Sequence, residues 1–124
     1  MIERNLGIKP ILVLDPTLLI DKKYYLNIIR NYKRDMKYKN YIFTYLLFGK
    51  KEIKEFIKKS CKKFQYELYI VYRSTKNNIV KFIYGIANSK AVITDSYHGT
   101  LFSIIFNKPF VSLINKEFDI ERFN

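Results

Sequence analysis

The chain has 124 residues and a mass of 15.0 kDa, which is enough for one domain with a packed core but not for two. Apolar residues make up 48% of the chain and aromatic residues 17%, so the composition excludes an intrinsically disordered protein. The longest apolar run, residues 41–48, is too short to span a membrane, and no signal peptide follows Met1. The sequence therefore predicts a cytoplasmic protein without a transmembrane segment.

The formal net charge of +12 could attract nucleic acid or an anionic membrane surface. Lysine supplies 18 of the 23 basic residues, and only five are arginine, the residue that contacts bases in a bidentate manner. The lysines are scattered over the polar faces of predicted helices rather than gathered in one block. We therefore interpret the charge as a solvated surface and do not expect a nucleic-acid partner. A basic nucleic-acid-binding module is the less favoured alternative.

The cysteine and histidine content limits the possible chemistry. A single cysteine, Cys61, excludes an internal disulfide and supplies no metal-ligand spacing. It falls on the apolar face of a predicted helix, so we expect a packed thiol rather than a nucleophile. With one histidine and no nucleophile elbow, a serine triad is unsupported. The sequence indicates no metal site and no cofactor.

The first half of the chain contains two predicted strands and two predicted helices. Residues 11–14 form an apolar strand that Asp15-Pro16-Thr17 ends, and this tripeptide is more simply a structural turn than the wall of a cleft. Asp21 can cap the first helix. Its apolar positions are Tyr25, Ile28, Ile29, Tyr32 and Met36. Residues 41–48 form a strand buried on both faces. The apolar stripe of the next helix consists of Ile53, Phe56, Ile57, Cys61 and Phe64.

The second half continues the alternation. We predict a strand at 67–72, a helix that begins at Asn77 or Asn78, a strand at 91–93, a polar loop at 94–100, a helix at 101–106 and a strand at 110–114. This order predicts an α/β fold with a Rossmann-like, mostly parallel sheet and helices on both faces. Both ends read as cut, since no helix follows the last strand. Residues 1–124 are therefore expected to form a single partial domain.

The polar loop at 94–100 contains His98, the only histidine. At the carboxyl end of a strand, an imidazole can act as a general acid or base, or as a cation toward phosphate. Gly99 would let the backbone approach a ligand, and Thr100 offers a hydroxyl at the helix start. Asp95 and Ser96 could cap the helix or orient the imidazole. The alternative is that both are only caps and that His98 is a packed turn residue.

Two arginines are further candidates for binding an anion. Arg73 follows a predicted strand at the sheet edge expected for His98, and a surface ion pair explains it equally well. Arg122 lies in the polar tail, where the local sequence does not indicate its role.

Three segments resemble the polysaccharide pyruvyl transferase family. They are VLDPTLLID at 13–21, FIYGIANSKAVITDSYHGTLFSIIFNKPF at 82–110, and the closing Arg122-Phe123. The resemblance implies a two-lobed fold of the glycosyltransferase B type, in which Rossmann-like halves face a cleft. This chain is similar to the carboxyl-terminal lobe, so an amino-terminal lobe and a helix after Arg122 are expected to be missing.

The resemblance also implies an activity. The family transfers a pyruvyl group from phosphoenolpyruvate to hydroxyls of a sugar in a cell-surface polysaccharide, with release of phosphate. The expected partners are phosphoenolpyruvate and a glycan or glycolipid acceptor, in the cytoplasm or at the inner face of the membrane. The alternative is a truncated, catalytically silent domain that binds an anion or a partner protein.

The family's functional histidine falls on His98, the expected catalytic residue. Where many members have an arginine two residues before it, this chain has Ser96. The expected substrate-binding residues are Ser96, Gly99, Thr100, Arg73 and Arg122.

Overall fold

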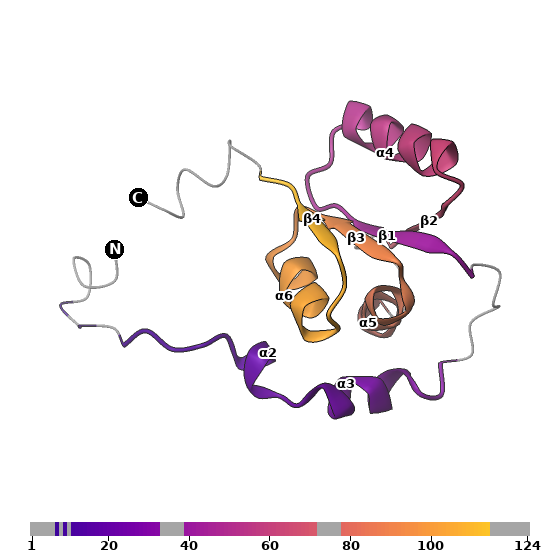
Figure 1. Cartoon of the computed structure of the whole chain (residues 1–124). Helices are drawn as coiled ribbons and strands as arrows, with labels where there is room; N and C mark the ends of the chain where they lie inside the picture. The colour runs from indigo at the N-terminus through magenta and orange to yellow at the C-terminus, as the bar shows by residue number, and fades with distance from the viewer. Residues whose placement is uncertain (1–6, 8, 10, 33–38, 72–77, 115–124) are drawn as a thin grey trace.

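The computed structural model describes residues 7, 9, 11–32, 39–71 and 78–114. In chain order, the elements are α2 (Pro16–Leu19), α3 (Lys22–Ile29), β1 (Tyr41–Tyr45), α4 (Lys51–Lys63), β2 (Glu67–Ile70), α5 (Asn78–Asn88), β3 (Ala91–Thr94), α6 (Tyr97–Ile105) and β4 (Phe110–Ser112). Figure 1 shows the four strands side by side with helices above and below them.

The sheet has the strand order β2-β1-β3-β4, and every pairing in it is parallel. From β1 the chain first moves to one neighbour, β2, and then crosses back to β3 on the opposite side. This order confirms the predicted α/β, Rossmann-like fold. It also creates a topological switch point between β1 and β3, the place where open α/β sheets bind ligands.

Helices cover both faces of the sheet, as predicted (Figure 1). On one face α4 packs against β2, with Ile57 and Cys61 buried beneath it. On the other face α5 contacts β1, α6 contacts β3, and α3 packs on α5. The thiol of Cys61 is free and buried, so the prediction of a packed cysteine is confirmed.

The main core lies on the α5 and α6 face and is rich in edge-to-face aromatic contacts. Phe43 of β1, Ile86 of α5 and Val92 of β3 are fully buried at its centre. Phe82 links the layers, since its ring meets those of Phe43 at 5.9 Å and Phe102 at 5.7 Å. Such pairs add to the hydrophobic stabilisation of the buried surface. The core therefore holds α6 firmly against the sheet.

The predicted strand at residues 11–14 is wrong. This segment is non-helical and lies away from the sheet, and its four side chains are 63% to 99% exposed. Apolar, β-branched residues favour a strand only where a neighbouring strand can pair with them, and here none does. The tripeptide Asp15-Pro16-Thr17, expected to form a turn at the end of this strand, instead begins α2, with Asp15 as the cap and Pro16 as the first residue.

Several predicted boundaries also shift. The strand expected to reach residue 48 ends at Tyr45, the strand expected to end at 93 includes Thr94, and the strand expected to reach 114 ends at Ser112. The helix expected at 101–106 begins at Tyr97, so His98 lies in its first turn and not in a loop. The predicted cap Asp21 is confirmed, with its carboxylate accepting from Lys23 N. Three predicted positions lie outside the described residues: Met36 on the first helix, Tyr72 at the end of the strand from residue 67, and Asn77 as a helix start.

Candidate functional site

The switch point brings two loops together at the carboxyl edge of the sheet. Tyr45, the last residue of β1, is in register with Thr94, the last residue of β3. The loop that leads into α4 and the loop that leads into α6 therefore leave the sheet side by side. The start of α6 carries His98 to this edge.

Asp95 joins these two loops. Its carboxylate accepts the backbone N–H of Leu47 at 2.6 Å and that of Phe48 at 2.9 Å. Just before it, the Thr94 hydroxyl donates to the carbonyl of Tyr45 at 2.7 Å. Asp95 was expected to cap α6 or to orient the imidazole, but these bonds instead hold the end of β1 to the end of β3.

Ser96 caps α6, one of the two roles that the sequence left open for it. Its hydroxyl accepts the N–H of Gly99 at 3.4 Å, and its carbonyl accepts the N–H of Thr100 at 3.1 Å. The N–H groups of Gly99 and Thr100, two residues expected to bind substrate, thus donate within the turn. Within the described part of the chain, the N–H groups of Tyr97 and His98 have no acceptor, as is usual for the first residues of a helix.

Gly99 is needed for close packing of α6 on β3. An added Cβ would lie 2.8 Å from the Thr94 methyl carbon and closer still to the Thr94 hydroxyl. Real Cβ atoms essentially never come that close to another heavy atom. Gly99 was expected to let the backbone approach a ligand, but the close approach seen here is to Thr94 of the same chain.

The Thr100 hydroxyl links α6 to β4, because it donates to Ser112 Oγ at 3.0 Å. His98 itself is exposed, and its ring meets the neighbouring ring of Tyr97 edge-on at 5.5 Å. The imidazole is therefore open to solvent beside the positive end of the helix dipole. An anionic ligand is favoured at this position, and a cationic imidazole would attract it further.

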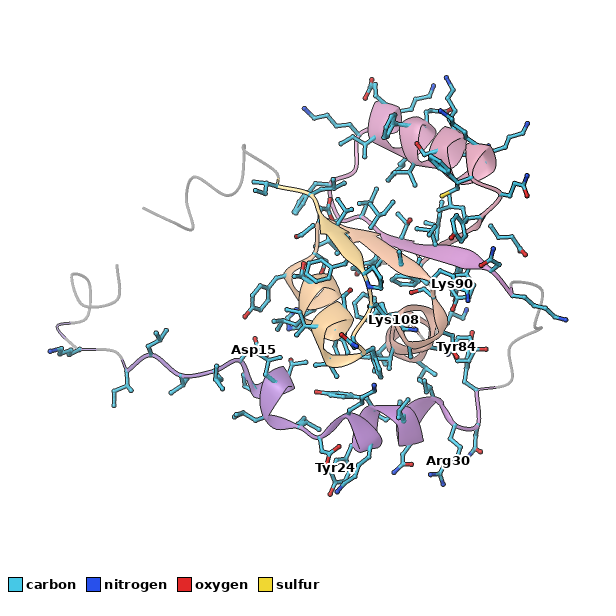
Figure 2. All side chains as sticks on the ribbon, in the orientation of Figure 1. Asp15, Tyr24, Arg30, Tyr84, Lys90 and Lys108 are labelled. Carbon is cyan, nitrogen blue, oxygen red and sulfur yellow. The ribbon has the colours of Figure 1, made fainter. Side chains whose placement is uncertain are left out.

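A carboxylate that the sequence analysis assigned to a structural turn lies on an element that contacts α6. Asp15 caps the short helix α2, which contacts α6 (Figure 2). Hydrogen bonds from the Thr17 side chain and from the Thr17 N–H lower the pKa of Asp15, and the positive charge of His98 lowers it further. The interaction joins residues 83 positions apart in the sequence.

Tyr25 of α3 stabilises this arrangement. Its hydroxyl donates to the carbonyl of Thr17 at 2.9 Å, and its ring packs edge-on against Phe102 of α6 at 4.9 Å. Burial, and then the negative charge of Asp15, raise the pKa of Tyr25. The sequence predicted Tyr25 only as an apolar helix position, because its spacing gives no sign of a contact with α2.

The remaining predicted site residues, Arg73 and Arg122, lie outside the described residues. Within the described ranges, no three residues of the His, Cys, Asp or Glu type form a group that could hold a metal ion. Nor does any helix in those ranges combine the length and apolarity that crossing a membrane requires.

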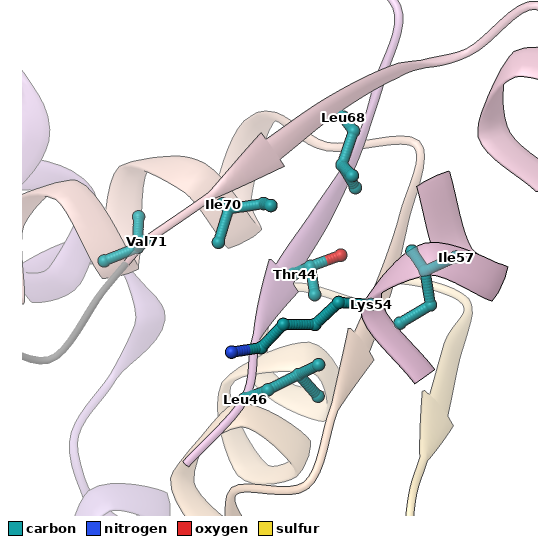
Figure 3. Close-up of a pocket in the computed structure, with 7 residues that line it drawn as sticks. All are labelled: Thr44, Leu46, Lys54, Ile57, Leu68, Ile70 and Val71. Carbon is teal, nitrogen blue, oxygen red and sulfur yellow. The ribbon is translucent and has the colours of Figure 1, made fainter. Parts of the chain in front are cut away.

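A hollow lies beneath α4, between its first turns and the ends of β1 and β2 (Figure 3). It is lined by Thr44, Leu46, Lys54, Ile57, Leu68, Ile70 and Val71. The cavity holds about 20 Å³, room for about one water molecule. The buried hydroxyl of Thr44 has no hydrogen-bond partner among the described residues. This space is too small for a substrate.

Comparison with known protein families gives a match over almost the whole chain. The model of the family described as polysaccharide pyruvyl transferase matches residues 1–117 of the 124. No curated protein and no solved structure matches the chain. The family match includes both segments that meet at this site, the one around Asp15 and the one around His98.

Proposed function

The chain belongs to the polysaccharide pyruvyl transferase family, and on that premise we propose that it takes part in transferring a pyruvyl group from phosphoenolpyruvate to sugar hydroxyls. The product is a ketal on a cell-surface polysaccharide, and phosphate is released. The family match is the observation that carries the proposal. The exposed imidazole of His98 beside the amino end of α6 supports it, since this is a suitable position for an anionic donor.

Under this proposal His98 acts as a general acid. Its cationic imidazole gives a proton to the methylene carbon of phosphoenolpyruvate, and the neighbouring carbon becomes electron-deficient. One sugar hydroxyl attacks that carbon and loses its proton. The bond to the phosphate oxygen then breaks, phosphate leaves with the electron pair, and a second hydroxyl closes the ketal. Of the two hydroxyl protons released, one restores the imidazolium and the other remains with phosphate.

The anionic groups of the donor would lie toward the start of α6. The N–H groups of Tyr97 and His98 are the donors available for them among the described residues. Ser96, Gly99 and Thr100 shape this turn through their internal hydrogen bonds. Arg73 and Arg122 remain proposed anion-binding residues from the sequence analysis.

The proposal extends to partners and location. The acceptor is a glycan or glycolipid, and a second lobe forms the opposite wall of the cleft, since alignment of donor and acceptor needs two walls that exclude water. The protein works in the cytoplasm, where phosphoenolpyruvate is available, or at the inner face of the membrane.

A catalytically silent domain that binds an anion or a partner protein is the second candidate. The observation that favours it is the apolar run at residues 11–14, whose side chains lie open to water. Exposed apolar surface of this kind is typical of a site that another protein covers.

Two measurements separate these candidates. Because His98 is the only histidine, its ring signals in an NMR spectrum report on this one site. Phosphoenolpyruvate should shift them, whereas a matched concentration of chloride should not. Phosphate release that depends on an added sugar acceptor would then demonstrate transfer. Binding without release supports the silent domain, and unchanged ring signals at millimolar phosphoenolpyruvate would reject the proposed site.

A further inference from the structure

We propose that the outer face of α4 binds the anionic surface of a lipid bilayer, with Phe56 inserted among the headgroups and the lysines of the helix in contact with their phosphates. The binding itself is independent of the proposed function. Its use, which is to hold the chain beside a glycolipid acceptor, rests on that function.

The charge of α4 is directed outward. The helix has six lysines and two glutamates between Lys51 and Lys63, and all eight of these residues are exposed. Its buried residues, Ile57 and Cys61, face the sheet, so most of the lysines lie on the sides away from it. Figure 1 shows α4 as the outermost layer above the sheet, with none of the other described elements beyond it. The outer face is therefore open to a partner, and its net positive charge favours an anionic one.

Exposed phenylalanines accompany these lysines. Phe56 is 71% exposed, although burial of so large an apolar side chain is normally favourable. Residues three or four positions apart are neighbours on a helix surface, so Phe56, Lys59 and Lys63 form one stripe along α4. Just after the helix, Phe64 is 66% exposed, and the ammonium of Lys63 lies 5.7 Å from the centre of its ring. The outer face thus combines exposed rings with positive charge.

This combination fits a layer of lipid headgroups better than the other anionic or apolar partners. Helices that lie in a membrane interface are rich in lysine and carry phenylalanine or leucine that enters the boundary of the acyl chains. A nucleic acid would match the charge, but α4 contains no arginine and presents a helix surface rather than a groove. A second copy of the chain would bring two basic helices together, which their like charges oppose.

Lipid binding agrees with the solvated state of the lysines in the free chain. Headgroup phosphates lie in the hydrated layer of a bilayer, so a lysine can contact them while its ammonium remains in water. The contact is therefore peripheral: the phenylalanine ring enters the interface, and the helix itself stays packed on β2.

The position of α4 connects this face to the candidate site. The loop that leads into α4 follows β1, and Asp95 accepts the N–H groups of Leu47 and Phe48 in that loop. α4 therefore begins at the same edge of the sheet as α6, the helix that carries His98. With α4 on the bilayer, this edge lies close to the headgroups, where the sugar of a glycolipid acceptor is found.

Vesicle co-sedimentation of the full chain tests the lipid binding. Vesicles made of equal parts phosphatidylglycerol and phosphatidylcholine should pellet the chain, and vesicles of phosphatidylcholine alone should not. Phe56→Ser should lower the partition coefficient about tenfold, because no ring then enters the interface at this position. The double variant Lys59→Gln, Lys63→Gln should lower it about fivefold for each lysine removed.

Two controls match these variants in chemistry but not in position. Ile79→Ser removes an apolar side chain that is 69% exposed on α5, and Lys22→Gln with Lys23→Gln removes two exposed charges from α3. Neither control should change the partition coefficient by more than about twofold, because charges far from the bilayer are screened. All the substituted residues are exposed, so each variant should keep the circular dichroism spectrum of the wild type.

Three results would overturn the inference. The first is a failure of the anionic vesicles to pellet the chain, and the second is an equal loss of binding in the lysine control. The third is binding to polyuridylate in place of the vesicles, which would assign the outer face of α4 to nucleic acid. Vesicle binding by a chain that transfers no pyruvyl group would support the lipid surface and reject the proposed function, whereas transfer without vesicle binding would do the reverse.

Discussion

At the scale of single residues, Asp95 shows how one side chain can form part of the architecture of a site. It lies between β3 and α6, yet both of its hydrogen bonds are to the loop after β1. Replacing it by alanine leaves two N–H groups without their charged acceptor. We expect Asp95→Ala to lower the free energy of unfolding by about 1–2 kcal/mol, measured by urea denaturation. Asp95→Asn, which keeps one acceptor oxygen, should lose less. Equal stability of all three proteins would contradict this role.

The two helix-capping carboxylates predict an acid-dependent loss of stability. Hydrogen bonds from Thr17 and Lys23, respectively, lower the pKa of Asp15 and Asp21 below the ordinary value of 3.8. Because the folded-state pKa is the lower one, their contribution is present above about pH 3.8 and is lost as the pH falls further. The double variant Asp15→Asn, Asp21→Asn should therefore show a smaller fall in Tm between about pH 5 and pH 3 than the wild type. Identical falls in Tm for the two proteins would show that these two carboxylates do not cause the loss of stability in acid.

Single residues also show which contacts can be predicted from the sequence and which cannot. The cap roles of Ser96 and Asp21 were predictable, because the cap and the N–H it accepts lie two or three residues apart. The pairing of Asp95 with Leu47 and the packing of α2 against α6 were not, because both depend on how distant segments fold together. Local spacing carries no information about contacts of that kind.

At the scale of elements, the contact of α6 with β3 depends on the absence of a side chain at Gly99. The neighbouring Thr94 cannot easily move, since its hydroxyl donates to Tyr45 and accepts from Ser96. Gly99→Ala should lower the free energy of unfolding by about 1–3 kcal/mol. In a double-mutant cycle the same change should cost less in a Thr94→Ala background, where space has been made. Strict additivity of the two changes would show that the contact is not the cause.

Beneath α4, removal of a buried hydroxyl should stabilise the protein rather than destabilise it. Thr44 is 2% exposed, and its hydroxyl has no partner among the described residues. Thr44→Val removes an unsatisfied polar group at nearly constant shape, so we expect a gain of about 1 kcal/mol in unfolding free energy. Thr100→Val is the matched control and should be destabilising, because its hydroxyl is bonded to Ser112. A destabilised Thr44→Val protein would mean that a water molecule satisfies the hydroxyl.

Elements were predicted best where two signals agreed. The strand and helix periods, together with turn residues, predicted β1 to β4 and α3 to α6 in the correct order. Residues 11–14 had only strand propensity and no neighbour, and the predicted strand is absent there. The start of α6 was placed late because the polar residues around His98 resemble a loop, although they form the first turn of a helix that Ser96 caps.

At the scale of the whole molecule, the positive charge is distributed as expected of a solvated surface. The six lysines of α4 are all exposed, while its buried side chains are apolar. The carboxyl edge of the sheet combines the imidazole of His98, the start of α6 and the carboxylate of Asp95. Under the proposed function, the chemistry of the chain is concentrated at the switch point of the sheet.

This concentration makes one substitution decisive for the proposed activity. His98 is exposed, and surface substitutions usually change stability by less than about 0.5 kcal/mol, so His98→Ala should fold normally. Loss of a general acid typically reduces the rate by about a hundred- to ten-thousandfold, and we expect a loss of kcat in this range in a phosphate-release assay. Ile104→Ala, an exposed position at the other end of α6, is the matched control and should retain full activity. A folded His98→Ala protein that turns over like the wild type would exclude the imidazole as the proton donor.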